Sequence, residues 1–138
     1  MKNGVNIPGA TNASYTTPAT TAADNGALFA VVVSNVAGSV TSNNAILTVT
    51  SSIPPTITTQ PANKTVTVGQ TAKFNVAATG TAPLTYQWMK NGVNISGATN
   101  ASYTTPPTTA ADSGSLFAVV VSNVAGSVTS NNAVLTVR

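Results

Sequence analysis

The sequence predicts an all-β chain, and three observations support this fold class. Thr, Ser, Asn, Ala and Val dominate the composition, and that mixture favours pleated strands over long helices. Apolar and polar residues alternate in short runs, separated by Gly, Pro and Asn turn signals roughly every eight to twelve residues, which is typical of a β-sandwich. Residues 1–50 also reappear as residues 89–138 with only six differences, so the chain is built from a repeated unit.

The repeat is 88 residues long and occurs one and a half times. Residues 53–88, here called the leading half, are present once, whereas the trailing half, residues 89–138, has a second copy at residues 1–50. The differences between the copies are mild: Pro8/Ser96, Ala19/Pro107, Asn25/Ser113, Ala27/Ser115, Ile46/Val134 and Thr50/Arg138.

This arrangement predicts three parts. Residues 1–50 form a partial module that holds trailing strands only, residues 51–56 a linker, and residues 57–138 a complete module. Ile-Pro-Pro at positions 53–55 supports the linker, because proline favours an extended chain and donates no ladder hydrogen bond.

In the leading half, the pattern predicts strands at residues 65–68, 71–76 and 84–88. The second places Ala72, Phe74 and Val76 on one face and Lys73 on the other, and in the third Tyr86 and Trp88 share a face. The dipeptide Asn91-Gly92 that follows is the strongest hairpin signal in the chain, with residues 93–95 returning from it.

In the trailing half, a short strand is expected at residues 102–105, and Asp112-Ser113-Gly114 turns the chain. Residues 116–122 are strongly apolar and β-branched, residues 123–126 turn the chain again, and residues 128–137 close the unit. Seven or eight short strands in this order predict a sandwich of two sheets.

These residues resemble the immunoglobulin-like fold, most closely the intermediate-set type that occurs in tandem in bacterial extracellular proteins. The resemblance covers residues 53–138 and rests on four motifs in order: Gly69-x-x-Ala72-x-Phe74-x-Val76, Trp88, Asp112-Ser113-Gly114-x-x-Phe117-x-Val119 and Val121-Ser122-Asn123-Val124-Ala125-Gly126. It implies an immunoglobulin-like Greek-key β-sandwich, with one complete module plus a trailing half-module.

The resemblance also implies a structural core of Phe74, Val76, Trp88, Phe117 and Val119. Val76 and Val119 take the places of the usual cysteines, and the missing disulfide forgoes about 3 to 4 kcal/mol of constraint on the unfolded chain. Phe117 replaces the usual tyrosine and lacks its hydroxyl.

The remaining tyrosines and the acidic residues are expected to be structural. The resemblance points Tyr15 and Tyr103 inward, which leaves no row of exposed aromatic side chains for a sugar. It makes Asp24 and Asp112 turn residues.

The composition argues against catalysis, metal binding and nucleic-acid binding. Asp24 and Asp112 are the only carboxylates, and the chain has neither His nor Cys, so we expect no enzyme activity, no metal site and no cofactor. Five scattered cations form no basic stripe, so nucleic acid is not an expected partner. An isopeptide bond from Lys64, Lys73 or Lys90 is a minor alternative, because such bonds need a buried acid beside the pair.

The second trailing half lacks the strands that would cover its apolar run. Leu28, Phe29, Val31 and Val33 are therefore a candidate strand-exchange surface, and such an uncharged, β-branched run is an aggregation hazard if it stays open. Each chain supplies two trailing halves and one leading half, so exchange between identical chains leaves some uncovered. We expect the chain to be a fragment of a longer tandem array, or a truncated reading frame, in which an upstream leading half completes residues 1–50.

Together these features predict a non-enzymatic structural or adhesive module of a bacterial secreted or cell-surface protein. The expected partners are neighbouring immunoglobulin-like modules of the same or another chain, with a surface protein or glycan as a further candidate. No segment has the apolar length for membrane insertion. Two alternatives are an accessory carbohydrate-binding domain of a secreted hydrolase and a strand-exchanging subunit of a self-assembling fibre.

Overall fold

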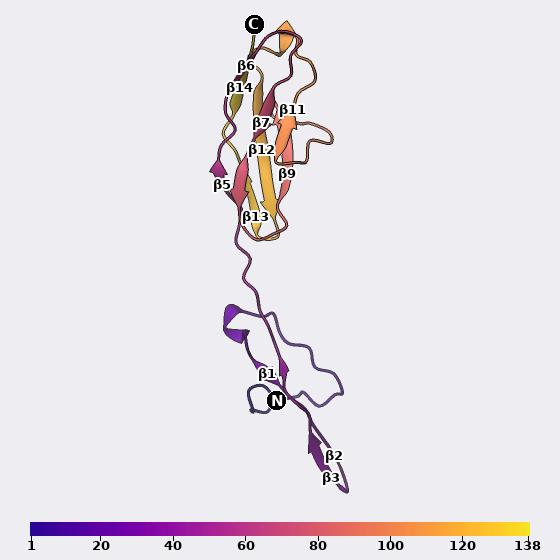
Figure 1. Cartoon of the computed structure of the whole chain (residues 1–138). Coiled ribbons are helices and arrows are strands. Elements are labelled where there is room, and N and C mark those ends of the chain that lie inside the picture. Colours follow the sequence, from indigo (N-terminus) through magenta and orange to yellow (C-terminus); the bar gives the residue numbers. More distant parts are fainter. The chain divides into compact units, whose positions relative to one another are not determined.

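The computed structural model describes residues 1–138 and divides into two compact units, Met1–Ser51 and Ser52–Arg138 (Figure 1). The second unit is an immunoglobulin-like β-sandwich, and the first contains the second trailing half.

One sheet of the second unit has β9 and β12 at its centre. Its strand order is β10-β9-β12-β14-β6, all neighbours are antiparallel except β14 and β6, and β13 forms a hairpin with β12. The strands are β6 (Lys64–Val66), β9 (Thr85–Lys90), β10 (Val93–Asn94), β12 (Leu116–Asn123), β13 (Gly126–Thr129) and β14 (Ala133–Val137).

The other side of the sandwich is made of two short antiparallel pairs, β11 with β7 and β5 with β8. Their bounds are β5 (Thr56–Thr59), β7 (Lys73–Asn75), β8 (Ala77–Thr79) and β11 (Ser102–Thr104). β7 and β8 are consecutive strands separated only by Val76. One continuous segment, residues 73–79, therefore pairs with β11 through its first part and with β5 through its second. A short 3₁₀ helix, η2 (Ala110–Asp112), precedes β12.

The hairpin signal at Asn91-Gly92 is confirmed. β9 ends at Lys90, β10 begins at Val93, and the two strands pair antiparallel. Asn91 has φ +51° and Gly92 has φ +80°, and two consecutive positive φ angles are what a two-residue hairpin turn that follows the strand twist requires.

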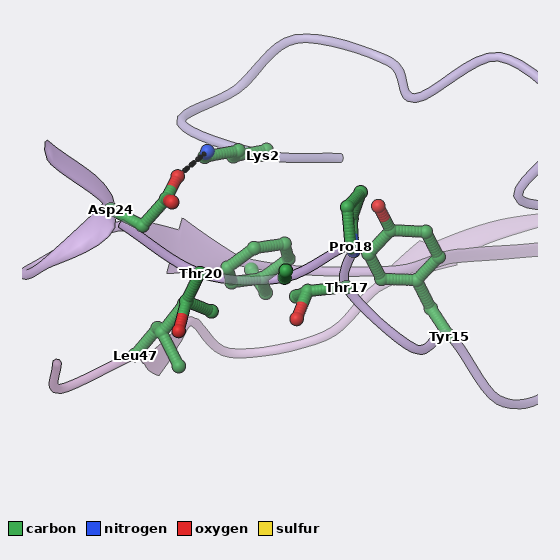
Figure 2. Close-up of a pocket in the computed structure, with 9 residues that line it drawn as sticks. Lys2, Tyr15, Thr17, Pro18, Thr20, Asp24 and Leu47 are labelled. Carbon is green, nitrogen blue, oxygen red and sulfur yellow. Dashed lines mark hydrogen bonds and ion pairs between the residues drawn. The ribbon is translucent and has the colours of Figure 1, made fainter. Parts of the chain in front are cut away.

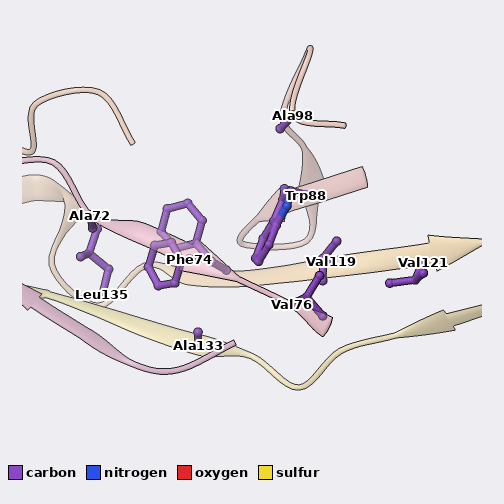
Figure 3. Packing of buried hydrophobic residues seen from close by; sticks show 10 residues of the cluster. Ala72, Phe74, Val76, Trp88, Ala98, Val119, Val121, Ala133 and Leu135 are labelled. Carbon is purple, nitrogen blue, oxygen red and sulfur yellow. The ribbon is translucent and has the colours of Figure 1, made fainter. Parts of the chain in front are cut away.

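The core of the second unit lies between its sheets, as Figure 3 shows. Phe74, Val76, Trp88, Phe117 and Val119 are all buried. The rings of Phe74 and Phe117 are stacked with centroids 4.6 Å apart, and the indole Nε1 of Trp88 donates to the carbonyl of Asn100 at 2.8 Å. In the absence of cysteine, packing of these side chains joins the sheets where a disulfide would otherwise do so, and the hydrogen bond ties Trp88 to the loop before β11.

The sequence pattern did not predict β5. Its residues, Thr-Ile-Thr-Thr, contain one apolar side chain and follow two prolines, so no alternation marks them. Ile53, inside the expected linker, also bonds to the second unit: its N–H donates to Thr81 Oγ1, and its carbonyl accepts from Thr81 N–H and Asn123 Nδ2.

Gly80 makes this close approach of the chain possible. Its φ is +143°, and a Cβ there would lie 3.0 Å from both the Pro54 carbonyl oxygen and the Pro55 Cα. Only glycine combines that backbone conformation with that clearance.

The first unit keeps the order of the trailing half but forms shorter strands. β1 pairs antiparallel with β4, β2 with β3, and Lys2 forms isolated bridges to Val5 and Phe29. The elements are η1 (Ala22–Asp24), β1 (Leu28–Phe29), β2 (Val32–Asn35), β3 (Gly38–Thr41) and β4 (Ala45–Ile46).

The clearest difference from the second unit is a broken strand. The continuous β12 of eight residues corresponds to two short strands, β1 and β2, interrupted at Ala30 and Val31. In the second unit β9 pairs along β12, whereas the first unit has no leading half to supply that neighbour. Ala27 is its only buried residue.

Candidate functional site

The two aspartates hold equivalent turns in the two units. Asp112 Oδ2 accepts from the Thr109 N–H at 2.8 Å and from its hydroxyl at 2.9 Å, while Oδ1 accepts from Lys90 Nζ at 2.6 Å. Asp24 bonds to Thr21 and Lys2 in the same way, and Figure 2 shows its pair with Lys2. Each carboxylate therefore caps one turn and ties it to the chain 22 residues upstream.

These contacts keep both carboxylates ionised. The hydrogen bond from Lys90 and those from Thr109 lower the pKa of Asp112 from 3.8 to about 2, and Lys2 and Thr21 do the same for Asp24. A general acid or base works best with a pKa near the working pH. Neither carboxylate is suited to that role at neutral pH, and both serve the turns.

No group of three or more His, Cys, Asp or Glu side chains is placed to hold a metal ion. The structure also contains no helix that is long and apolar enough to cross a membrane.

The first unit contains two shallow grooves that share Tyr15 and Phe29. One, of about 200 Å³, runs from Tyr15 past Pro18 to the ion pair of Lys2 and Asp24, with Leu47 on its wall (Figure 2). The other, of about 270 Å³, lies over Tyr15, Phe29 and Val31. In the second unit, the counterparts of these three residues are Tyr103, Phe117 and Val119, which belong to or pack against the core.

The residues predicted to form an exchange surface are exposed to different degrees. Val31 is 48% exposed and Val33 60%, whereas their counterparts Val119 and Val121 are both 0% exposed. Phe29 is half-buried. The apolar face that points into the sandwich in one copy is therefore open to solvent in the other.

Leu28 belongs to the other side of this strand. It is half-buried, and its counterpart Leu116 remains exposed in the complete sandwich. Since side chains alternate along a strand, Phe29, Val31 and Val33 share the inward direction and Leu28 does not. We call these three residues the open face.

The expectation that Tyr15 is a core residue is wrong. The residue is 44% exposed, and its ring stacks on that of Phe29 with centroids 6.0 Å apart. The counterpart Tyr103 lies 6.4 Å from the ring of Trp88 and 5.9 Å from that of Phe117. Tyr15 lacks a tryptophan to cover it, so the same sequence leaves an aromatic pair at the surface.

Sequence reasoning missed the partners of the lysines and of one serine. The sequence does hold a signal for the ion pair of Lys90 with Asp112, because the two residues recur at the same spacing as Lys2 and Asp24. Ser130 Oγ accepts from the buried Val119 N–H at 2.9 Å, and no motif in the sequence predicts that contact. Lys64 and Lys73 form no ion pair.

Comparison with known proteins supports the fold. The immunoglobulin domain family model matches residues 54–123, about half of the chain. Titin domain M7 is 32% identical over 64% of this chain and 98% of its own length, with a TM-score of 0.57.

Two longer structures are also similar. The I-band fragment I67–I69 of titin is 28% identical over 61% of this chain, with a TM-score of 0.54, and immunoglobulin domains 1–5 of Sidekick-1 are 25% identical over 80%, with a TM-score of 0.56. This chain spans 32% of the titin fragment and 24% of the Sidekick-1 chain. With the two-sheet core and this family match, the chain belongs to the immunoglobulin domain family.

Proposed function

We propose that this chain is a non-enzymatic structural or adhesive module of a secreted or cell-surface protein built from tandem repeats, of the kind found in bacteria. The observation that carries the proposal is the repeat: fifty residues recur with six mild differences. A near-identical copy extends a protein by a fixed increment, as in a spacer or a repeated surface, without adding a new reactive group.

The domain organisation in this proposal is a partial module at residues 1–50, a short connection, and a complete module that follows. The division of the chain into Met1–Ser51 and Ser52–Arg138 supports it. The hydrogen bonds of Ile53 suggest that the connection is shorter than residues 51–56, because they join that residue to the complete module.

The geometry of the second unit suits a load-bearing role. The chain enters at Ile53, beside Asn123 at the end of β12, and the C-terminus lies at the opposite end of the unit (Figure 1). β6 and β14 run parallel between these ends, and Arg138 adds two backbone hydrogen bonds to Val66 and Val68. Tension between the ends would load this ladder in shear, so several hydrogen bonds resist together.

Force spectroscopy on single chains tethered at both termini tests the spacer role. We expect one cooperative rupture from the second unit and extension of the first unit at lower force, because its strands are short and its apolar side chains are exposed. Val68→Pro removes the N–H that donates to Arg138 and should lower the rupture force. A chain that extends without any force peak would rule out a load-bearing spacer.

A second candidate function is carbohydrate binding, and the stacked pair of Tyr15 and Phe29 favours it. An exposed aromatic pair beside a groove can stack on a sugar ring. The counterparts of this pair are Phe117, which lies in the core, and Tyr103, which packs against it. This argues that the pair is exposed because the first unit has no leading half packed over it, and not because it forms a binding site. A glycan pull-down with the full chain and with Tyr15→Ala separates the two: retention of a glycan that the variant loses would support the second candidate.

A further inference from the structure

The second unit shows how the residues of the open face are arranged when they are covered. Phe29, Val31 and Val33 correspond to Phe117, Val119 and Val121, which are buried. The leading half covers these counterparts through the Phe74 ring, which stacks on Phe117, and through β9, which pairs along β12. The second unit therefore shows which kind of segment fits the open face.

The start of the chain already occupies part of that position. In the second unit, Lys90 pairs with Phe117, Met89 with Ala118 and Trp88 with Val119, and the ladder continues to Thr85 opposite Ser122. In the first unit, Lys2 bridges to Phe29, and the Met1 amine donates to the Ala30 carbonyl at 2.8 Å. The pairing thus begins in register and stops at residue 1.

The positions opposite Val31, Val32, Val33 and Ser34 correspond to Trp88, Gln87, Tyr86 and Thr85. A strand that ran directly into Met1 would occupy all four positions in register, and its last residue would face Val31 where Trp88 faces Val119.

Three carbonyls beside the second groove also lack their usual donors. In the complete sandwich, Ala98 and Asn100 accept from the backbone N–H and the indole Nε1 of Trp88, at 2.9 and 2.8 Å, and Ala101 accepts from the Val76 N–H at 3.0 Å. The corresponding carbonyls of Ala10, Asn12 and Ala13 receive no hydrogen bond from the chain. Their positions match one tryptophan and one backbone donor of a leading half.

The hydrogen bonds that hold the inward strand in the second unit are already present around the open face of the first unit. Val31 N–H donates to Ser42 Oγ at 3.0 Å, as Val119 does to Ser130 at 2.9 Å. Leu28 N–H donates to Asn3 Oδ1 at 2.8 Å, as Leu116 does to Asn91 at the same distance. A docking segment would therefore meet a local framework that needs little rearrangement, which lowers the entropy cost of binding.

We propose that the open face is the docking surface for the leading half of an immunoglobulin sandwich, whose last strand pairs along residues 31–34 in the register of β9 on β12. The occupant has the chemistry of residues 53–88: an uncharged inward face with a phenylalanine at the position of Phe74 and a tryptophan opposite Val31, as Trp88 lies opposite Val119. The mode is strand addition, with main-chain hydrogen bonds for affinity and inward side chains for specificity. It holds whether the module is structural or adhesive, whereas a docked leading half would cover Phe29, on which the sugar-binding candidate depends.

The test extends the full chain with a copy of residues 53–88 placed before Met1 and compares it with the original chain by amide hydrogen exchange. In the original chain, amides of residues 31–34 should exchange far faster than those of residues 119–122. In the extended chain their exchange should slow by at least about 100-fold, as expected when an exposed segment joins a cooperative core. The added tryptophan should become buried, and its indole N–H should show the same protection as that of Trp88.

Two matched variants of the extended chain separate docking from a general effect on the fold. Val31→Asp places a charge on the open face and should abolish the new protection. Val36→Asp changes a side chain at the tip of the β2–β3 turn, which is 109% exposed, and should leave the protection intact. The amides of residues 116–123 serve as an internal standard, since they report the second unit in every variant.

The proposal is overturned if the extended chain leaves residues 31–34 as fast to exchange as before. It is also overturned if residues 31–34 of the original chain become protected as its concentration rises, while light scattering shows that the chain associates. A second copy would then be the occupant. Loss of the protection in Val36→Asp as well as in Val31→Asp would equally contradict docking on this face.

Discussion

Residues 1–50 and residues 89–138 have nearly the same sequence and different environments. Val119 and Val121 are fully buried, whereas Val31 and Val33 are about half exposed or more. The first pair belongs to the same buried cluster as Trp88 of the leading half, and residues 1–50 have no leading half before them in this sequence. What differs is the presence of the leading half, so burial of this face is determined by a segment outside the repeat copy.

Hydrogen bonding within the two copies hardly differs. Lys2 and Asp24 are paired at 2.5 Å, and Lys90 and Asp112 at 2.6 Å. The Asn35 side chain accepts from the Ala37 N–H at 2.8 Å, and its counterpart Asn123 accepts from the Ala125 N–H at 2.9 Å. Turns and caps therefore follow from the nearby sequence, whereas the long strand β12 and the core need the sequence-distant leading half.

The comparison predicts its largest contrast for a buried charge. Val121→Asp should destabilise the second unit by several kcal/mol, on the order of 4 or more, because it buries an unpaired carboxylate. Val33→Asp should cost far less, since that side chain is already 60% exposed. Trp88 is the only tryptophan, so its fluorescence during urea unfolding reports the second unit alone.

In that experiment, Val121→Asp should abolish or strongly shift the unfolding transition. For Val33→Asp, amide hydrogen exchange of residues 28–35 reports the first unit and should change little. An unchanged transition in Val121→Asp would mean that this position is not part of a packed core.

A second pair tests the aromatic cluster. Phe117→Ala removes a fully packed ring and should cost about 3–5 kcal/mol. Phe29→Ala removes a half-buried ring that stacks only on Tyr15 and should cost about 1 kcal/mol. Native-state hydrogen exchange measures both, with amides of residues 116–123 and 28–35 as the respective reporters. Equal costs would show that the first unit has a core as well packed as the second.

Much of the second unit could be predicted from residues close together in sequence. Alternation put Phe74 on one face of its strand with Ala72 and Val76, and Trp88 on one face with Tyr86, while the resemblance assigned Phe74 and Trp88 to the core. Asn91-Gly92 identified the hairpin, because that signal depends only on neighbouring residues. β5 could not be predicted, since its single apolar residue, Ile57, creates no pattern. Its position depends instead on pairing with β8 and on the clearance at Gly80.

The candidate site could be predicted in part. The sequence indicated an apolar run without a cover, but not that Tyr15 would be exposed or that the strand would break at Ala30 and Val31. Both outcomes depend on contacts that only a leading half provides. The pairing of Lys90 with Asp112 also escaped prediction, because it joins the β9–β10 hairpin to η2 across 22 residues and follows no local period.

A smaller contrast is expected for the serine that each copy uses to hold the inward strand. Ser130→Ala leaves the buried Val119 N–H without an acceptor and should cost about 1–3 kcal/mol. Ser42→Ala should cost less than about 0.5 kcal/mol, because water can reach the exposed Val31 N–H. Urea unfolding followed by Trp88 fluorescence measures the first, and exchange of the Val31 amide the second. Threonine at either position keeps a hydroxyl and is the control.

The smallest contrast is expected for the aspartates, where the two copies should behave alike. Both have a pKa of about 2 in the folded chain against an ordinary value of 3.8. A lowered pKa means that the folded state favours the ionised form, so the contribution to stability is complete above about pH 3.8 and is lost as the pH falls through about 2. Carboxyl chemical shifts measured by NMR should therefore titrate near pH 2 for Asp24 and Asp112 together.

Lys2→Met and Lys90→Met provide the matched test of that equality. Each should raise the pKa of its own aspartate toward 3.8 and leave the pKa of the other aspartate unchanged. The reason is that the hydrogen bond from the lysine lowers the pKa more than any other contact does. A normal pKa for Asp24 beside a low one for Asp112 would show that the turn contacts need the complete sandwich. In that case even the turn held by Asp24 would depend on the leading half, and the conclusion that turns follow from the nearby sequence alone would be wrong.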